Sequence, residues 1–201
     1  RPVRPSTPRP TRPATATPTV TPAAPGASDD DAARRARTLA HLMETVLGDP
    51  AEAEAALPAL VRMVRERDGN VDGLVRDLEQ RAVGPRRLAG MLALASIERL
   101  GGRFDAAEQR LRALLDDPAG RRDPTPRLRL ADMLRGLGRH ADALPLLREA
   151  WERREGGDGA RALRRDEQTE LLRALRDTAL AQDDLEGARE AHRRLVALPR
   201  E

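Results

Sequence analysis

The sequence predicts an all-α fold of antiparallel helical hairpins stacked one on the next, preceded by a disordered tail. Ala, Leu, Arg, Glu and Asp dominate the chain, while aromatic residues make up 1% of it, and this composition favours helices over sheets. From residue 29 onward apolar residues recur every three or four positions, which is the period of an amphipathic helix. Tight turns also recur, at steps of 33, 36 and 45 residues, as is typical of stacked helical hairpins.

The predicted tail comprises residues 1–28, a linker rich in Pro, Thr and Arg that we expect to be disordered. It holds eight Pro and six Thr residues and nothing apolar enough to form a core, so it favours an extended polyproline II spacer. Two alternatives stay open, namely a Pro-x-x-Pro ligand for a small recognition domain and a phosphoacceptor tract. The helical repeat domain is predicted to span residues 29–201.

The first helices of that domain are marked by apolar stripes and by their ends. The first stripe consists of Leu39, Leu42, Met43, Val46 and Leu47. Gly48 is expected to end this helix. Asp49, Pro50 and Glu52 then supply an N-cap, a proline at the first helical position and an acid two positions later, which predicts a new helix. Pro58 is expected to kink or restart it.

Four connections between predicted helices repeat along the chain. They are tight turns at residues 68–71, 101–104, 137–140 and 182–185. The segments GGRFDAAEQRLRALLDDP and LADMLRGLGRHADALPLLREAW, which contain the second and third turns, resemble the turns and flanking helices of bacterial-type tetratricopeptide repeat (TPR) proteins. The resemblance covers about residues 54–200 and implies a right-handed α-solenoid.

The resemblance extends to residue size at the family's packing positions. Small residues are found at Ala95, Ala131, Ala107, Ala143 and Ala188. Large apolar residues are found at Leu94, Leu130, Leu175, Leu111 and Leu147. The family's aromatic positions are mostly Leu, Met or Ala here, and Leu74 stands where a small residue is usual. The longer interruptions at 116–126 and 155–166 are interpreted as spacers, with functional loops as the alternative.

The stretch GLGRHA at residues 136–141 can be interpreted as the short Gly-x-Gly-x-x-Ala form of a dinucleotide-binding fingerprint. That fingerprint requires a strand before it and a helix after it. A predicted helix precedes it here, and the chain has no Lys for the other common phosphate loop. We therefore expect Gly138 to be the C-terminal cap of a helix.

No catalytic group emerges from the rest of the sequence. The chain has no Cys, its Ser residues lie outside any Gly-x-Ser-x-Gly motif, and its three His residues do not have the spacing of metal ligands. The TPR resemblance implies that His140 and His192 are half-buried packing residues. The sequence predicts a protein that is not an enzyme, with no catalytic residues, no cofactor and no metal.

The charge of the chain is unevenly distributed. Four of the 36 basic residues, all of which are Arg, lie in residues 1–28, which hold no acid, and the remaining 32 are balanced by 33 acidic residues. This balance argues against nucleic-acid binding by the repeat domain. No apolar run is long enough to span a membrane.

The resemblance implies that the first helix of each hairpin lines a concave partner-binding face. It places there Leu92, Ser96, Arg99, Arg129, Asp132, Arg135, Arg173 and Asp177. The Lys and Asn clamp of chaperone-binding family members is absent, because the chain has no Lys and only one Asn. Arg129, Arg135 and Arg173 could instead grip an acidic segment. The alternative is an ordinary surface on which Asp132 and Asp177 pair with these Arg residues.

The resulting hypothesis is a protein–protein interaction scaffold or adaptor that binds a peptide or a partner domain on the concave face of a TPR solenoid. One alternative is the regulatory or sensory C-terminal segment of a larger bacterial signalling enzyme, for example a Ser/Thr kinase. Another is nucleic-acid binding through Arg residues. Because the chain begins at Arg1, we expect a segment of something longer. We expect it in the cytoplasm, or in the cell envelope if an upstream signal or anchor exists.

Overall fold

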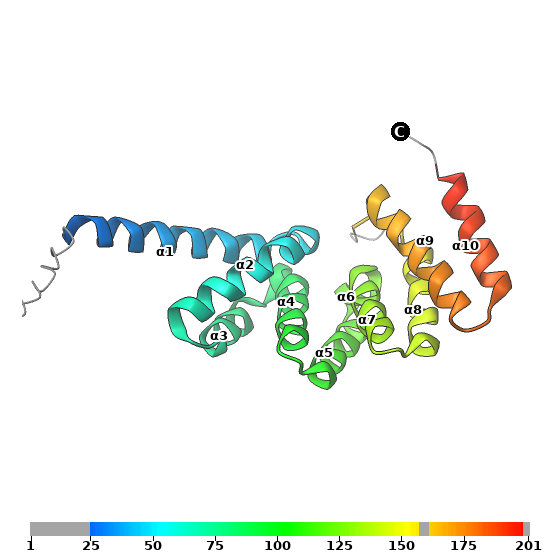
Figure 1. Cartoon of the computed structure of the whole chain (residues 1–201), viewed down its shortest axis with the longest axis horizontal. Helices are drawn as coiled ribbons and strands as arrows, with labels where there is room; N and C mark the ends of the chain where they lie inside the picture. Colours follow the sequence, from blue (N-terminus) through cyan, green and yellow to red (C-terminus); the bar gives the residue numbers. More distant parts are fainter. Residues whose placement is uncertain (1–24, 157–160, 199–201) are drawn as a thin grey trace, which may run out of the picture. The chain divides into compact units, whose positions relative to one another are not determined.

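The computed structural model describes residues 25–156 and 161–198, and these residues contain α-helices, one 3-10 turn and no strand (Figure 1). The all-α prediction is therefore confirmed for this part of the chain. In chain order the elements are α1 (Pro25–Leu47), α2 (Pro50–Asp68), α3 (Asp72–Arg81), the 3-10 turn η1 (Gly84–Arg86), α4 (Arg87–Leu100), α5 (Phe104–Asp116), α6 (Pro118–Arg122), α7 (Thr125–Gly136), α8 (His140–Glu152), α9 (Arg165–Leu180) and α10 (Leu185–Ala197).

Helix α1 begins at Pro25, before the predicted end of the linker at residue 28. Proline suits the first turn of a helix because its fixed φ is already helical and its missing N–H has no partner there. Residues 1–24 of the predicted linker lie outside the described residues. The chain divides into two compact units, residues 1–36 and 37–201, and the packing described below belongs to the second.

Helix α2 continues through Pro58, so the prediction that this residue restarts the helix is wrong. Proline removes the hydrogen bond to the carbonyl of Glu54, four residues earlier. Both residues are exposed, so water can satisfy the freed carbonyl oxygen.

Three connections between helices share one backbone geometry. Gly102, Gly138 and Asp183 have φ values of 73°, 74° and 56°. In each case the amide of this residue donates to the carbonyl three residues earlier, and the next amide donates to the carbonyl five residues before itself, at N···O distances of 2.8–3.1 Å. Such bonds satisfy carbonyls that the end of a helix leaves open. Gly138 is thus a helix cap, as predicted, and the element directly before it is the helix α7.

From α4 onward the main helix contacts are between α4 and α5, α5 and α7, α7 and α8, α8 and α9, and α9 and α10. Figure 1 shows α7 beside α8 and α9 beside α10, each pair joined by a short connection. Ala107, Ala131 and Ala143 are completely buried. Their small side chains allow the packed helices to approach each other closely. The described part of the chain is therefore repeat-like, built from helices that pack mostly on their neighbours in sequence.

The buried apolar side chains form two clusters that meet at α4. Leu94 and Ile97 belong to the cluster that includes α1, α2 and α3. Leu92 and Ala95, on another side of the same helix, belong to the cluster that extends through α10. Helix α4 is buried on both sides and joins the two parts of the core.

The predicted spacer at residues 116–126 contains the short helix α6. The side chain of Asp117 accepts a hydrogen bond of 3.0 Å from the amide of Ala119, and Pro118 occupies the first turn. Both are start signals for a helix. Gly120 permits the close return of the chain, since a Cβ there would overlap the carbonyl of Leu114.

Candidate functional site

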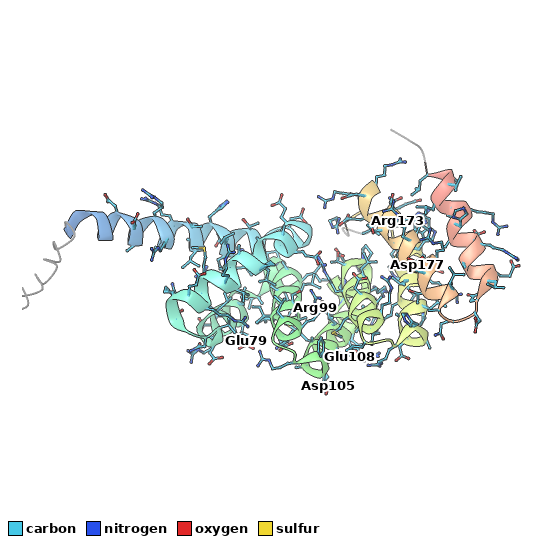
Figure 2. All side chains as sticks on the ribbon, in the orientation of Figure 1. Glu79, Arg99, Asp105, Glu108, Arg173 and Asp177 are labelled. Carbon is cyan, nitrogen blue, oxygen red and sulfur yellow. The ribbon has the colours of Figure 1, made fainter. Side chains whose placement is uncertain are left out.

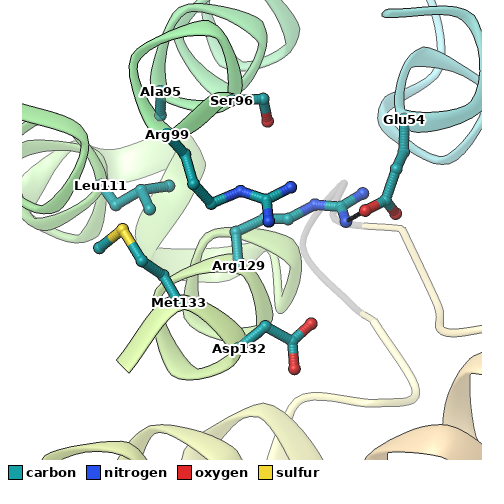
Figure 3. Close-up of a pocket in the computed structure, with 8 residues that line it drawn as sticks. All are labelled: Glu54, Ala95, Ser96, Arg99, Leu111, Arg129, Asp132 and Met133. Carbon is teal, nitrogen blue, oxygen red and sulfur yellow. Dashed lines mark ion pairs between the residues drawn. The ribbon is translucent and has the colours of Figure 1, made fainter. Parts of the chain in front are cut away.

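Two adjoining hollows lie along α4, α7 and α9, which are the first helices of the hairpins α4/α5, α7/α8 and α9/α10. The smaller, of about 60 Å³, is lined by Glu54, Ala95, Ser96, Arg99, Leu111, Arg129, Asp132 and Met133 (Figure 3). The larger, of about 420 Å³, is lined by Glu54, Thr125, Leu128, Arg129, Asp132, Arg135, Leu147, Arg161, Arg164, Asp166, Glu167, Glu170, Leu171 and Ala174. Because they share Glu54, Arg129 and Asp132, we call the two together the inner groove.

The inner groove brings together five of the eight residues that sequence analysis assigned to a binding face. These are Ser96, Arg99, Arg129, Asp132 and Arg135. They come from α4 and α7, which place them on the same side of successive hairpins. The two hollows thus run across the first helices of neighbouring hairpins.

The other three assigned residues do not line the groove. Leu92 is only 5% exposed and belongs to the core, so its assignment to a contact surface is wrong. Arg173 and Asp177 are exposed on α9 (Figure 2), where Glu170, Leu171 and Ala174 face the larger hollow instead. Sequence spacing placed these residues on the correct helices, but the packing of each helix decides which side is open.

The arginines of the groove differ in their partners. Arg129 of α7 forms an ion pair with Glu54 of α2, and Arg135 lies 3.3 Å from a carboxylate oxygen of Asp132. Arg99 has no acidic partner among the residues the structure describes, although its side chain extends into the smaller hollow beside Arg129 (Figure 3). Arg99 is thus a cation of the groove that a bound anionic group could neutralise.

Asp132 lines both hollows. Its side chain is 60% exposed, but the surrounding helices reduce the water around it. This desolvation raises the pKa of Asp132 above its usual range, and Arg135 and Arg129 oppose the shift. A further positive group delivered by a partner would therefore favour the ionised carboxylate of Asp132.

Outside the groove, Arg173 and Asp177 have partners on their own helix. Arg173 lies 2.5 Å from a carboxylate oxygen of Glu170, and Asp177 lies 2.8 Å from Arg176. The alternative of an ordinary paired surface therefore holds for Arg135 with Asp132, but Arg173 does not pair with Asp177. Exposed pairs of this kind contribute little to stability.

The segment 161–164 supplies groove residues that sequence analysis missed. Arg161 donates to both carboxylate oxygens of Glu167 at 2.6 and 2.9 Å, and to the hydroxyl of Thr125 at 3.4 Å. Burial alone would raise the pKa of Glu167, but hydrogen bonds from Arg161 and from the amide of Arg164 lower it overall. The predicted spacer thus returns to α7 and forms one wall of the larger hollow.

The chemical groups of the inner groove are carboxylates, guanidinium groups, hydroxyls, aliphatic side chains and the thioether of Met133. In residues 25–156 and 161–198 no cluster of three or more His, Cys, Asp and Glu side chains could hold a metal ion. His140 is half-buried as expected, whereas the expectation for His192 is wrong, because it is exposed on α10. The groove is therefore equipped for recognition through charge and apolar contact.

No protein-family model matches the chain, and searches of curated proteins and of solved structures find no significant match. Among the helices described, none combines the length and the apolar character needed to cross a membrane.

Proposed function

We propose that this chain is a protein–protein interaction scaffold that binds a peptide or a partner domain along the inner groove, in the manner of a TPR solenoid. The observation that supports it is the continuity of two hollows across α4 and α7, with a further wall from α9. Sites for extended peptides need a groove that several elements share and that offers both apolar and polar contacts.

The lining of the groove suits a peptide of mixed character. Half-buried Leu128 provides apolar contact in the larger hollow, whose lining also includes the buried Leu147 and Leu171. Arg99 and Arg129 present guanidinium groups in the smaller one, and each can offer two parallel donors to a carboxylate. Because acidic groups alternate with these arginines, the pattern of charges would select partners more than it would raise affinity.

Binding without catalysis is part of this proposal. The ionisable groups of the larger hollow are Arg, Asp and Glu, and the pairs Arg129–Glu54, Arg135–Asp132 and Arg161–Glu167 are already formed. Such pairs fix side chains in place and favour recognition.

Charge reversal at two groove arginines tests the proposal. Arg129→Glu with Arg135→Glu in the full chain places two new carboxylates beside Glu54 and Asp132, so we expect capture of partners to fall at least tenfold. Affinity capture followed by quantitative mass spectrometry measures the yield of each partner, and circular dichroism checks that helicity is kept. Recovery of the same partners at an unchanged yield would show that the groove is not the binding surface.

A matched control separates the groove from general surface charge. Arg173→Glu reverses an exposed arginine on α9 that lies outside both hollows. We expect partner yields to be unchanged in this variant. An equal loss in the control and in the double variant would instead indicate a nonspecific effect of net charge.

A further inference from the structure

A third hollow lies on the open side of the last hairpin, between α9 and α10. It has a volume of about 470 Å³ and is lined by Arg176, Leu180, Leu185, Ala188, Arg189, His192 and Arg193. We call it the terminal groove. Leu180 and Leu185 are 48% and 56% exposed, which is unusual for large aliphatic side chains in a chain whose other Leu residues are mostly covered.

In the preceding hairpin, the face of α8 that corresponds to this face of α10 is covered by another helix. When the connections at Gly138 and Asp183 are superposed in sequence, Leu144 and Leu147 of α8 correspond to Arg189 and His192 of α10. Both leucines of α8 are buried, because α9 packs against that helix. The same face of α10 is uncovered by the described residues and carries basic side chains in place of leucines.

Among the residues that the structure describes, the charged side chains that line the terminal groove are all basic. Arg176, Arg189 and Arg193 line it together with His192, and no acidic residue does. The acids nearest in sequence, Asp177, Glu186 and Glu190, pair with these arginines at 2.6–3.1 Å but lie outside the lining. The groove is therefore apolar with a rim of basic side chains. Arg189 and Arg193 are exposed and Arg176 is half-buried, and each guanidinium retains donors beyond its ion pair.

We propose that the terminal groove binds an acidic amphipathic helix of a partner protein. A helix with leucine-sized residues at i, i+4 and i+7 would cover Leu180 and Leu185, and flanking Asp or Glu residues would meet Arg176, Arg189 and Arg193. A nucleic acid could contact the arginines but would leave Leu180 and Leu185 exposed. A second copy of this chain would place its own basic side chains against those of the groove, and like charges repel. Charge complementarity thus favours an acidic helix.

Fluorescence anisotropy with three synthetic peptides tests this inference on the full chain. The probe is a fluorescein-labelled, 16-residue helical peptide with Leu at every third or fourth position and Glu at the flanking positions. In one control peptide every Glu is replaced by Lys, and in the other every Leu by Ser. We expect saturable binding of the Leu/Glu peptide, at least tenfold weaker binding of both controls, and weakening as salt rises.

Variants of the chain locate the site. Arg189→Glu with Arg193→Glu, and separately Leu185→Ser, should each weaken binding of the Leu/Glu peptide at least tenfold. Leu137→Ser, which alters another exposed leucine at a connection between helices, should leave it unchanged. Circular dichroism confirms that the altered surface residues preserve helicity.

Several outcomes would overturn the inference. Equal binding of the Glu and Lys peptides would remove its electrostatic basis, and unchanged binding to the Arg189/Arg193 double variant would remove its location. Loss of binding in the Arg129/Arg135 double variant alone would assign the peptide to the inner groove. Self-association in analytical ultracentrifugation that Leu185→Ser abolishes would show that the face joins two copies. Assignment of the peptide to the inner groove would also support the proposed function, whereas the other results leave that proposal unaffected, because the two grooves have no residue in common.

Discussion

At the scale of single residues, Gly136 and Gly138 stand two positions apart and differ only in backbone conformation. A Cβ at either would meet nothing within 4 Å, but Gly138 has φ +74° and Gly136 ends α7 without a positive φ. We expect Gly138→Ala to lower the free energy of unfolding by about 1–2 kcal/mol, because an L side chain disfavours left-handed backbone. Gly136→Ala should leave it unchanged or raise it by up to about 1 kcal/mol. Urea unfolding followed by circular dichroism measures both, and equal shifts would contradict the assigned cap.

At the scale of helices, periodicity and turn residues predicted long helices, but not the short helix α6, which lies in a predicted spacer. The stripe from Leu39 to Leu47 and the cap at Gly138 are local signals, and the helices end close to where these signals end. The side of each helix that packs is decided by distant segments. Leu92 is buried by the core that extends from α4 through α10, and Arg129 meets Glu54 of α2. Neither contact can be predicted from the sequence around these residues.

Helix α4 offers a second test, because its close packing depends on Gly90. A Cβ at this position would overlap the Cβ of Ala82 and approach Leu47 at 3.4 Å. Although Ala is the better helix former, we expect Gly90→Ala to destabilise the fold by about 1–3 kcal/mol through overpacking. Gly73→Ala is the matched control in α3, where a Cβ meets nothing within 4 Å, and it should stabilise by up to about 1 kcal/mol. Thermal unfolding of both variants measures the difference, and stabilisation by Gly90→Ala would refute this packing.

At the scale of the whole molecule, ion pairs connect one hairpin to the next. Glu108 of α5 accepts a 2.6 Å hydrogen bond from Arg139, which lies in the connection between α7 and α8. Arg148 of α8 donates one of 2.5 Å to Asp184, in the connection between α9 and α10. In both cases the second helix of one hairpin contacts the connection of the next hairpin. In the first case the helix supplies the acid and the connection supplies the arginine, and in the second case the helix supplies the arginine and the connection supplies the acid. In a repeat-like array whose stability depends on contacts between neighbours, these pairs help couple adjacent hairpins.

The Glu108 pair makes stability depend on pH with a definite sign. Hydrogen bonds from Arg139 and then Arg112, opposed by burial, lower the pKa of Glu108 from its ordinary value of 4.5. The carboxylate therefore stabilises the folded state above pH 4.5, and this contribution is lost as the pH falls through the lower folded value. We expect Glu108→Gln to lower the urea midpoint at pH 7 and to approach the unsubstituted chain at pH 3. Glu186→Gln, which alters a carboxylate 82% exposed on α10, should change the midpoint little at either pH. A constant difference between Glu108→Gln and the unsubstituted chain across this range would mean that the loss comes from packing, and the charge of Glu108 would then have no part in joining the hairpins.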